Sequence, residues 1–484
     1  MKSLTKWKKA QVIVILGAAT AVAAHAQTFT PLAKFNGSNG GAPDGSLTQG
    51  TDGDLHGVGF YGGAGGGTVF RAAPLELTSV HVFDGQDGWD PYGSLALAAN
   101  GHFYGVTQGG GPQSFGTVFG VDPEGGVRTL YAFGETDAGQ EPIQGLILGS
   151  DGNLYGTTPS CFADCGYGTV FKITLGGALT TLHSFHGTDG AVPSGRLIEA
   201  SDGRFYGTTS HGGRKNPDCI SACGTIFSVT REGVEKTLYR FNFVDGYAPV
   251  GTLAQDPNGS FYGTTAGGGN VNANCSFGCG TVFKFDSTGA LTTLYSFSGS
   301  DGAVPISGLI GATDGNFYGV TEFGGSGSCA EYYPLGCGTV FQVTPTGVLT
   351  VLYNFTTVGD GAYPYGGLFQ ATNGSLYGTT QSGGIVSPDC ANVTCGTLFS
   401  MDMGLAPFVS FVTPAGKIGQ TGGILGQGFT GTTNVTINGT PATFTVESDT
   451  FITATIPTGA TSGYVTVTTP GGTLTSNVPF HVLN

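Results

Sequence analysis

The sequence predicts an all-β protein, and three observations support this prediction. Glycine supplies 89 of the 484 residues and charged residues only 10% of them, whereas a helix-rich chain uses more Ala, Leu, Glu and Lys. Short runs of β-branched and aromatic residues alternate with Gly and Asx turn signals, which is typical of strands joined by tight turns. After the first thirty residues, no window keeps the 3.6-residue apolar period of a helix.

The first 26 residues have the pattern of a secretory signal. Four lysines lie between positions 2 and 9, an apolar run fills positions 12–24, and Ala24-His25-Ala26 supplies a cleavage motif. The run is short for a membrane span and no second one follows, so no transmembrane segment is expected in the mature chain. We expect residues 1–26 to be removed on export to the periplasm, cell surface or surroundings of a bacterium.

The charge balance narrows the choice of partners. The formal net charge is −15 with the lysines of the signal included, so the mature chain is more acidic still. Nucleic acid and anionic membrane surfaces are disfavoured as partners, because proteins bind both through clustered Lys and Arg. An extracellular glycan, an extracellular protein or a cation is compatible with this charge.

A repeat of three landmarks dominates the rest of the chain. The first is a Phe that closes an apolar strand, the second a D/N-G-x-F/L-Y-G element, and the third a G-T-V-F element. The phenylalanines, 48 to 58 residues apart, are Phe35, Phe83, Phe133, Phe185, Phe241, Phe297 and Phe355. The third element begins at Gly67, Gly116, Gly168, Gly224, Gly280, Gly338 and Gly396.

Each unit of this repeat parses into four antiparallel strands. In the unit that follows Phe297, we expect strands over 307–312, 317–321, 338–344 and 348–355. Seven such units predict a seven-bladed β-propeller over residues 27–404; a β-solenoid is the alternative, but its coils need fewer residues. A lone strand over 31–35 precedes the first unit and the last unit lacks its fourth strand, so together they complete one sheet and close the ring.

The repeat resembles the GloVer repeat of exported bacterial proteins, named after Gloeobacter and Verrucomicrobia. The resemblance covers about residues 30–404 and rests on F-Y-G-T-T, on G-T-V-F and on the L-T-T-L-Y-S-F strand at 291–297. It implies no particular activity. Members often end in a sorting or anchoring tail, and this sequence departs from that pattern.

Residues 405–484 form a separate segment in which the repeat and the cysteines disappear. Its length, composition and Asn438-Gly439 turn signal predict a small β-sandwich. Strands are expected over 423–425, 434–437, 442–446, 451–456 and 464–468. The segment resembles an IPT/TIG immunoglobulin-like domain at 426–429, 438–442, 456–457 and 459–463, and such domains serve as spacers, adhesion modules or accessory domains.

Ten cysteines form five local pairs in the loops between the second and third strands of units three to seven. They are Cys161/Cys165, Cys219/Cys223, Cys275/Cys279, Cys329/Cys337 and Cys390/Cys395. The first two units have shorter loops without cysteine, as expected if a disulfide holds each longer loop in an exported protein. Zinc is the alternative, but no pair has the nearby His or second Cys pair that a closed zinc site requires.

The loop that joins consecutive units carries an acid and a proline in the pattern F-x3-D/N-G-x2-P. Its acids could place up to six carboxylates around one end of the channel and hold Ca²⁺, which prefers several oxygen ligands. Alternatively, each Asp caps its own turn and each Pro sets its own φ. The carboxylates are Asp87, Asp137, Asp189, Asp245, Asp301 and Asp360.

Aromatic residues that interrupt the repeat are the candidate ligand-binding residues. Trp89, Tyr247 and Tyr363 lie in the loops between units, and Tyr332 and Tyr333 lie in the longest cysteine loop. Such side chains can stack on sugar rings or anchor a protein partner, or they can pack between neighbouring loops.

Catalytic signals are weak. The histidines are scattered, His56 and His183 stand where the repeat has Tyr, and no nucleophile-elbow, zinc-protease or nucleotide-binding pattern is present. The sequence therefore predicts a binding or adhesion module without catalytic residues, and without a cofactor other than the calcium considered above. The alternatives are a polysaccharide-acting hydrolase or lyase that uses loop carboxylates, and a purely structural envelope or matrix protein.

Overall fold

The computed structural model describes residues 27–483 apart from 75, 136–138, 160–165, 220–221, 287, 328, 330–335, 357–358 and 391–393. The predicted signal lies outside the described residues. Two short 3₁₀ turns, Gly63–Gly65 and Pro388–Cys390, are the only helical segments in the described chain. No described segment forms a helix with the length and apolarity needed to cross a membrane. The prediction of an all-β chain is confirmed.

Seven sheets follow one another along the described chain, and strands that are neighbours within a sheet are antiparallel. Sheet 1 holds β2 (Gly41–Pro43), β3 (Thr48–Gln49), β4 (Leu55–Tyr61), β5 (Thr68–Ala73) and β6 (Glu76–Val82). Sheet 2 holds β7 (Trp89–Leu97), β8 (Phe103–Gly109), β9 (Thr117–Val121) and β10 (Val127–Ala132). Sheet 3 holds β11 (Ile147–Leu148), β12 (Leu154–Thr158), β13 (Thr169–Ile173) and β14 (Leu179–Ser184).

The next three sheets repeat the same order. Sheet 4 holds β15 (Ala191–Pro193), β16 (Ile198–Glu199), β17 (Phe205–His211), β18 (Thr225–Val229) and β19 (Glu235–Arg240). Sheet 5 holds β20 (Ala254–Gln255), β21 (Phe261–Thr265), β22 (Thr281–Phe285) and β23 (Leu291–Ser296). Sheet 6 holds β24 (Ile310–Gly311), β25 (Phe317–Thr321), β26 (Thr339–Val343) and β27 (Leu349–Asn354).

Sheet 7 joins the two ends of the repeat region. It holds β28 (Phe369–Gln370), β29 (Leu376–Thr380), β30 (Thr397–Asp402) and, as its fourth strand, β1 (Thr28–Lys34) from the start of the described chain. β1 runs antiparallel to β30, with Thr28 opposite Asp402 and Lys34 opposite Thr397. The predicted pairing of the first strand with the last unit is confirmed, and it covers an edge that would otherwise be exposed.

The D-G-x-F-Y-G element is explained by packing within its own sheet. In sheet 6, Asp314 accepts the Asn316 N–H at 3.0 Å and the Tyr318 hydroxyl at 2.7 Å, which closes the turn between the first two strands. Gly319 has no room for a side chain, because a Cβ there would lie 2.7 Å from the ring of Phe341. The glycine of this element therefore makes room for the Phe of G-T-V-F on the neighbouring strand.

Two further residues of the same element hold strands and sheets together. The last Thr of F-Y-G-T-T pairs with the Thr of G-T-V-F, as in the buried Thr265–Thr281 contact at 2.8 Å. The Tyr of one sheet stacks on the Phe of the next, with ring centroids 3.9 Å apart for Tyr262 and Phe317. The recurring motif is thus a set of packing contacts, and such buried aromatic pairs are stabilising beyond the area they bury.

An inter-sheet proline contact joins each sheet to the one before it. The residue before the loop proline donates its N–H, at 2.8 to 3.1 Å, to the carbonyl that precedes the G-T-V-F glycine of the preceding sheet. That residue has φ between 45° and 58° in all seven units, a conformation that non-glycine residues rarely adopt, least of all before proline. The seven are Ala42, Asp90, Glu141, Val192, Ala248, Val304 and Tyr363.

The proline itself packs on that glycine of the preceding sheet. Gly280 has φ of 94°, and a Cβ there would lie 2.6 Å from Cδ of Pro305 and 2.4 Å from the carbonyl oxygen of Thr265. Because Ala42 makes the same hydrogen bond to Cys395, sheet 1 is joined to sheet 7 and the ring is closed. The seven sheets therefore form a β-propeller-like ring; five of them have four strands, and sheets 1 and 4 have a fifth, short strand.

The C-terminal segment folds into further sheets. One contains β31 (Ser410–Phe411), β33 (Thr421–Leu425), β37 (Phe451–Thr455) and β36 (Thr443–Val446). Another contains β35 (Thr440–Pro441), β34 (Asn434–Ile437), β38 (Val465–Thr469) and β39 (Gly472–Thr475). β32 (Ala415–Lys417) pairs in parallel with β40 (His481–Leu483). Residues of the two four-stranded sheets share one buried core.

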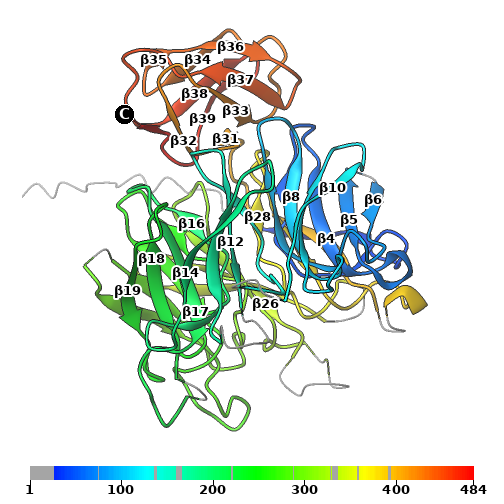
Figure 1. The fold of residues 1–484 in the computed structure, drawn as a ribbon, viewed down its shortest axis with the longest axis vertical. Coiled ribbons are helices and arrows are strands. Elements are labelled where there is room, and N and C mark those ends of the chain that lie inside the picture. The colour runs from blue at the N-terminus through cyan, green and yellow to red at the C-terminus, as the bar shows by residue number, and fades with distance from the viewer. Residues whose placement is uncertain are drawn as a thin grey trace, which may run out of the picture.

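The C-terminal segment sits at one end of the ring (Figure 1). It meets the turns between first and second strands, where the Thr450 hydroxyl donates to the carbonyl of Thr51 at 2.7 Å. Leu425 and Phe451 belong to one buried cluster with Leu97 and Phe103 of sheet 2. The segment is thus packed against the ring through apolar side chains as well as hydrogen bonds.

We expect Gly280→Ala to lower the free energy of unfolding by roughly 3 kcal/mol, because the new Cβ would collide with Pro305 and with the Thr265 carbonyl. Gly289→Ala is the matched control: its φ is 96°, but the only neighbouring atom is 3.6 Å away, so a cost of about 1 kcal/mol is expected. Urea unfolding of both variants measures the difference. Equal costs would contradict the packing role of the inter-sheet proline contact.

Candidate functional site

All seven sheets contribute residues to a narrow channel that runs between them. The cavity has a volume of about 240 Å³ and is lined by residues that follow the loop prolines. Glycines bring the sheets close together here: a Cβ on Gly45 would lie 2.1 Å from the carbonyl oxygen of Gly93, and one on Gly93 would lie 2.1 Å from the N of Gly145. The ring is therefore tightly closed around the channel.

One end of the channel faces the C-terminal segment. A second cavity of about 390 Å³ shares Ser46, Ser94 and Arg196 with the first and is also lined by Phe411 and Leu425. The other end lies among the inter-unit loops and the loops between second and third strands. We call this end the loop face.

Two acidic side chains lie near each other at this end: Asp44 lines the channel, and Glu322 is close enough to feel its charge. Burial, opposed by a hydrogen bond from Gln381 and reinforced by the charge of Asp90, raises the pKa of Asp44 to about 7. Burial and the nearby charge of Asp44 raise the pKa of Glu322 to about 7. Near neutral pH each carboxyl group can therefore donate or accept a hydrogen bond.

Polar and aromatic groups surround these acids. The Gln381 side-chain amide donates to Asp44. Tyr92 and Tyr365 lie close enough to affect each other's titration, and burial raises the pKa of both hydroxyls, so they stay protonated. Deeper in the channel, Arg196 donates to the carbonyl of Leu146 at 3.1 Å, and burial lowers its pKa to about 10, which still leaves it charged at neutral pH.

The sequence analysis missed this constellation, although a signal for it exists. Asp44, Tyr92 and Tyr365 occupy the position directly after the loop proline, where the other units have Ile, Val or Ser. Glu322 and Gln381 occupy the position directly after the F-Y-G-T-T strand. Both positions vary from unit to unit, so comparing the units at these positions would have singled out the polar residues.

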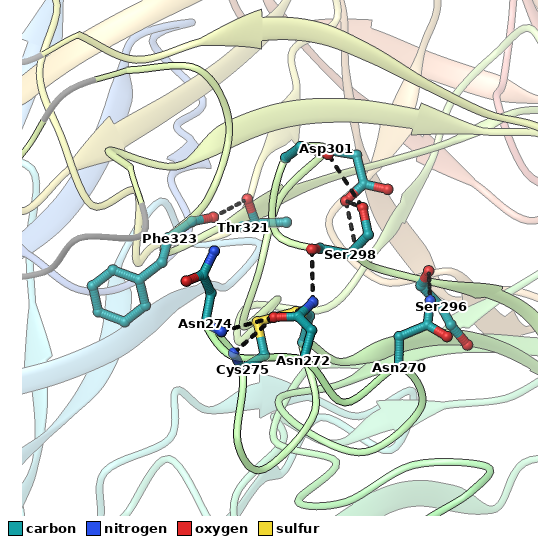
Figure 2. The surroundings of a disulfide bond; sticks show 11 residues. Asn270, Asn272, Asn274, Cys275, Ser296, Ser298, Asp301, Thr321 and Phe323 are labelled. Carbon is teal, nitrogen blue, oxygen red and sulfur yellow. Dashed lines mark hydrogen bonds between the residues drawn. A yellow bond between two sulfur atoms is a disulfide. The ribbon is translucent and has the colours of Figure 1, made fainter.

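The acids of the inter-unit loops serve their own turns. Asp301 accepts the Ser298 N–H at 2.8 Å and the Tyr295 hydroxyl at 2.5 Å, and Figure 2 shows it beside Ser298. The same two contacts, with His in place of Tyr at two sites, recur at Asp87, Asp189, Asp245 and Asp360. Asp137 lies outside the described residues. These contacts favour the turn-capping interpretation, and calcium binding by the six acids stays a prediction.

The predicted aromatic residues mostly fill space. On the first strand of their sheets, Trp89 lies opposite Gly109 and Tyr247 lies opposite Gly267. In sheets 1 and 6 the order is reversed: the aromatic residue, Tyr61 or Phe323, is on the second strand, opposite Gly41 or Ala303. Trp89 is still 43% exposed. Tyr363 packs edge-on against Phe323, with ring centroids 5.5 Å apart. Tyr332 and Tyr333 lie outside the described residues, and ligand binding by all five stays a prediction.

Four of the five predicted cysteine pairs are disulfides in the described chain. They are Cys219–Cys223, Cys275–Cys279, Cys329–Cys337 and Cys390–Cys395, whereas Cys161 and Cys165 lie outside the described residues. The loop of Cys275 packs on its own inter-unit turn (Figure 2): Asn272 donates to the carbonyl of Ser298 at 2.9 Å, and Asn270 to that of Ser296 at 3.0 Å. No cysteine of the described chain is free to bind zinc.

The chain belongs to the Gloeobacter/Verrucomicrobia repeat family. The family matches residues 15–160, 135–333 and 277–467, which include the whole ring of sheets and most of the C-terminal segment. The predicted repeat resemblance is thereby confirmed. No curated protein matches the sequence.

Solved structures add evidence on the fold. A fungal alcohol oxidase of the AA5 family, in complex with copper, is 13% identical over 95% of this chain and 100% of its own, with a TM-score of 0.53. The extracellular domain of a hybrid two-component system from B. thetaiotaomicron is 11% identical over 95% of this chain and 60% of its own, with a TM-score of 0.48. A gluconolactonase from Xanthomonas campestris is 14% identical over 63% of this chain and 90% of its own, with a TM-score of 0.39. The first of these likenesses shows a shared fold.

We expect stability to fall as the pH rises from about 4 through about 7, because Asp44 and Glu322 are charged in the unfolded chain but hold their protons when folded. Each group contributes a slope of at most about 1.4 kcal/mol per pH unit between its two pKa values. Urea unfolding at several pH values measures the decline. Replacing both residues, Asp44→Asn and Glu322→Gln, should flatten it, and an unchanged slope in the double variant would contradict the raised pKa values.

We expect Asp301→Ala to lower the free energy of unfolding by about 2 kcal/mol, because the Tyr295 hydroxyl and the Ser298 N–H both lose a charged acceptor. Thermal unfolding with calcium and with chelator tests the two interpretations of the loop acids. Turn capping gives the same loss in both solutions. A calcium-dependent increase in melting temperature that disappears in Asp301→Ala would instead support a cation site.

Proposed function

We propose that the chain is an exported seven-bladed β-propeller over residues 27–404 followed by an IPT/TIG-like immunoglobulin β-sandwich over 405–484. The closed series of seven sheets supports the blade count. Two four-stranded sheets around one core support the sandwich, and Asn438 and Gly439, with φ of 46° and 80°, form its hairpin turn. Export is supported by the disulfides, which persist in oxidising compartments such as the periplasm or the exterior of a bacterium.

The function supported best is binding of a neutral extracellular glycan at the loop-face mouth of the channel. The observation that carries this proposal is the meeting of Asp44, Glu322 and Gln381 with the Tyr92–Tyr365 pair. Sugar hydroxyls both donate and accept hydrogen bonds, and carboxyl groups with a pKa of about 7 can do the same. Tyrosine rings supply a flat apolar face with a polar tip, which suits the face of a sugar ring.

The size and chemistry of the mouth favour a glycan over a protein or a nucleic acid as the ligand. A protein partner typically buries about 800 Å² of surface on each side of an interface. A cavity of about 240 Å³ is small for such a contact, although the surrounding loops could contact a protein. A nucleic acid would meet two acids and an excess of negative charge.

A second candidate is a polysaccharide-acting hydrolase or lyase, and the acid pair is the observation that favours it. Asp44 and Glu322 are close enough for the charge of one to raise the pKa of the other. A carboxyl group with a pKa near the working pH is suited to general acid–base catalysis. In this alternative, the C-terminal sandwich is an accessory domain.

Binding to a glycan array, with a matched assay for sugar release, tests the proposal. The double variant Glu322→Ala/Tyr365→Ala should bind its best glycan at least tenfold more weakly, which corresponds to about 1.4 kcal/mol. Trp89→Ala, on the same face but outside the mouth, is the control and should bind within about twofold of the unaltered chain. If the double variant and Trp89→Ala lose equal affinity for the glycan, the binding site would be assigned to the aromatic loops instead of the channel.

The same experiment separates the function classes. Binding without sugar release supports a binding module. Sugar release that is lost in Asp44→Asn supports the enzyme. If the chain neither binds a glycan nor releases sugar, both the binding module and the enzyme are contradicted, and a structural envelope or matrix protein is left.

A further inference from the structure

We propose that His183, His186 and Asp189 form a binding site for a borderline divalent cation such as Zn²⁺, in the turn between sheets 3 and 4. One ligand atom from each of the three lies within 4.8 Å of the others. Nε2 of His183 is 3.0 Å and Nδ1 of His186 is 3.6 Å from Oδ2 of Asp189. Among the described residues, no other group of three His, Cys, Asp or Glu side chains meets this condition. The interpretation of the histidines as scattered is therefore wrong for this pair.

The repeat itself shows which part of this turn is structural. Asp189 needs one ring donor from the preceding strand, and the equivalent turns supply it from Tyr239, Tyr295 or Tyr353. His183 fills that role here, so its contact with Asp189 alone does not indicate a metal. Five other described turns have an acid or amide at the position of Asp189, and at the position of His186 they have Asn36, Asp84, Asn242, Ser298 and Thr356. Only this turn adds a second imidazole.

The turn holds the imidazole of His186 beside the ligand atoms of His183 and Asp189. Oδ1 of Asp189 accepts the backbone N–H of His186 at 2.7 Å, which leaves Oδ2 facing both rings. A carboxylate that is fixed through one oxygen presents the other in a defined direction, as supporting hydrogen bonds do in metal sites. Two imidazole nitrogens with one carboxylate oxygen suit Zn²⁺ and similar cations, whereas Ca²⁺ prefers oxygen ligands throughout.

One side of the site is open. The side chain of His186 is 76% exposed, in contrast to 17% for His183 and 18% for Asp189. His186 lines a cavity of about 950 Å³, together with Tyr167, His211 and Lys215. Three protein ligands and an open position are typical of zinc sites that exchange a ligand, so water or a small anion would complete the coordination from this cavity.

Titration of the untagged mature chain with Zn²⁺, followed by calorimetry, tests the site. The unaltered chain should bind one equivalent with a dissociation constant in the micromolar range or below. His183→Tyr should lose at least 30-fold in affinity but keep its fold, because Tyr is the residue that the equivalent turns carry. His186→Ala should show a similar loss. His81→Tyr, in the turn of His81, Asp84 and Asp87, is the matched control and should leave the affinity unchanged.

The proposal is overturned if the chain takes up no Zn²⁺ at micromolar concentration. It is also overturned if His183→Tyr binds Zn²⁺ as tightly as the unaltered chain, or if His81→Tyr loses as much affinity. Melting temperatures of the metal-free variants show that each is folded. An excess of Ca²⁺ should not displace Zn²⁺, and displacement would assign the turn to oxygen-preferring cations instead.

Discussion

The inter-sheet proline contact is the constraint on which the rest of the structure depends. One residue in each unit adopts a left-handed conformation at an energetic cost, and the ring compensates this cost with a hydrogen bond to the preceding sheet. The proline that follows lies against a glycine that has no room for a side chain. Two recurring features of the sequence, the loop proline and the G-T-V-F glycine, are therefore two halves of one contact.

This contact also decides where variable side chains can act. Because the proline is held against the preceding sheet, the residue after it is directed to the channel mouth. Nothing in the contact requires a particular side chain there, and the units differ freely: Ile143, Val250 and Ile306 in some, Asp44 and Tyr92 in others. A chemical site can therefore change at these positions without disturbing the ring.

Much of the fold could be predicted because its determinants are local and repeated. The expected strand over 317–321 is β25, and the third and fourth strands of that unit differ from expectation by one residue at each end. The expected first strand over 307–312 is reduced to Ile310–Gly311, because Gly308 lies against Thr252 of the neighbouring sheet instead of pairing within its own. That contact depends on the closed ring, which no single unit encodes.

The site was harder to predict because it depends on which units face one another across the channel. Glu322 and Asp44 are far apart in sequence, and only ring closure brings them together. The aromatic residues illustrate the opposite error, in which residues without a shown role are singled out as a site. Trp89 and Tyr247 break the pattern on one strand, but a glycine on the next strand compensates each of them. A departure from a repeat indicates function only when no neighbouring departure balances it.

The C-terminal segment contributes side chains to the far end of the channel. Phe411 and Leu425 line the cavity there, together with Ser46 and Arg196 of the ring. A substitution in either part of the chain would therefore change the same cavity.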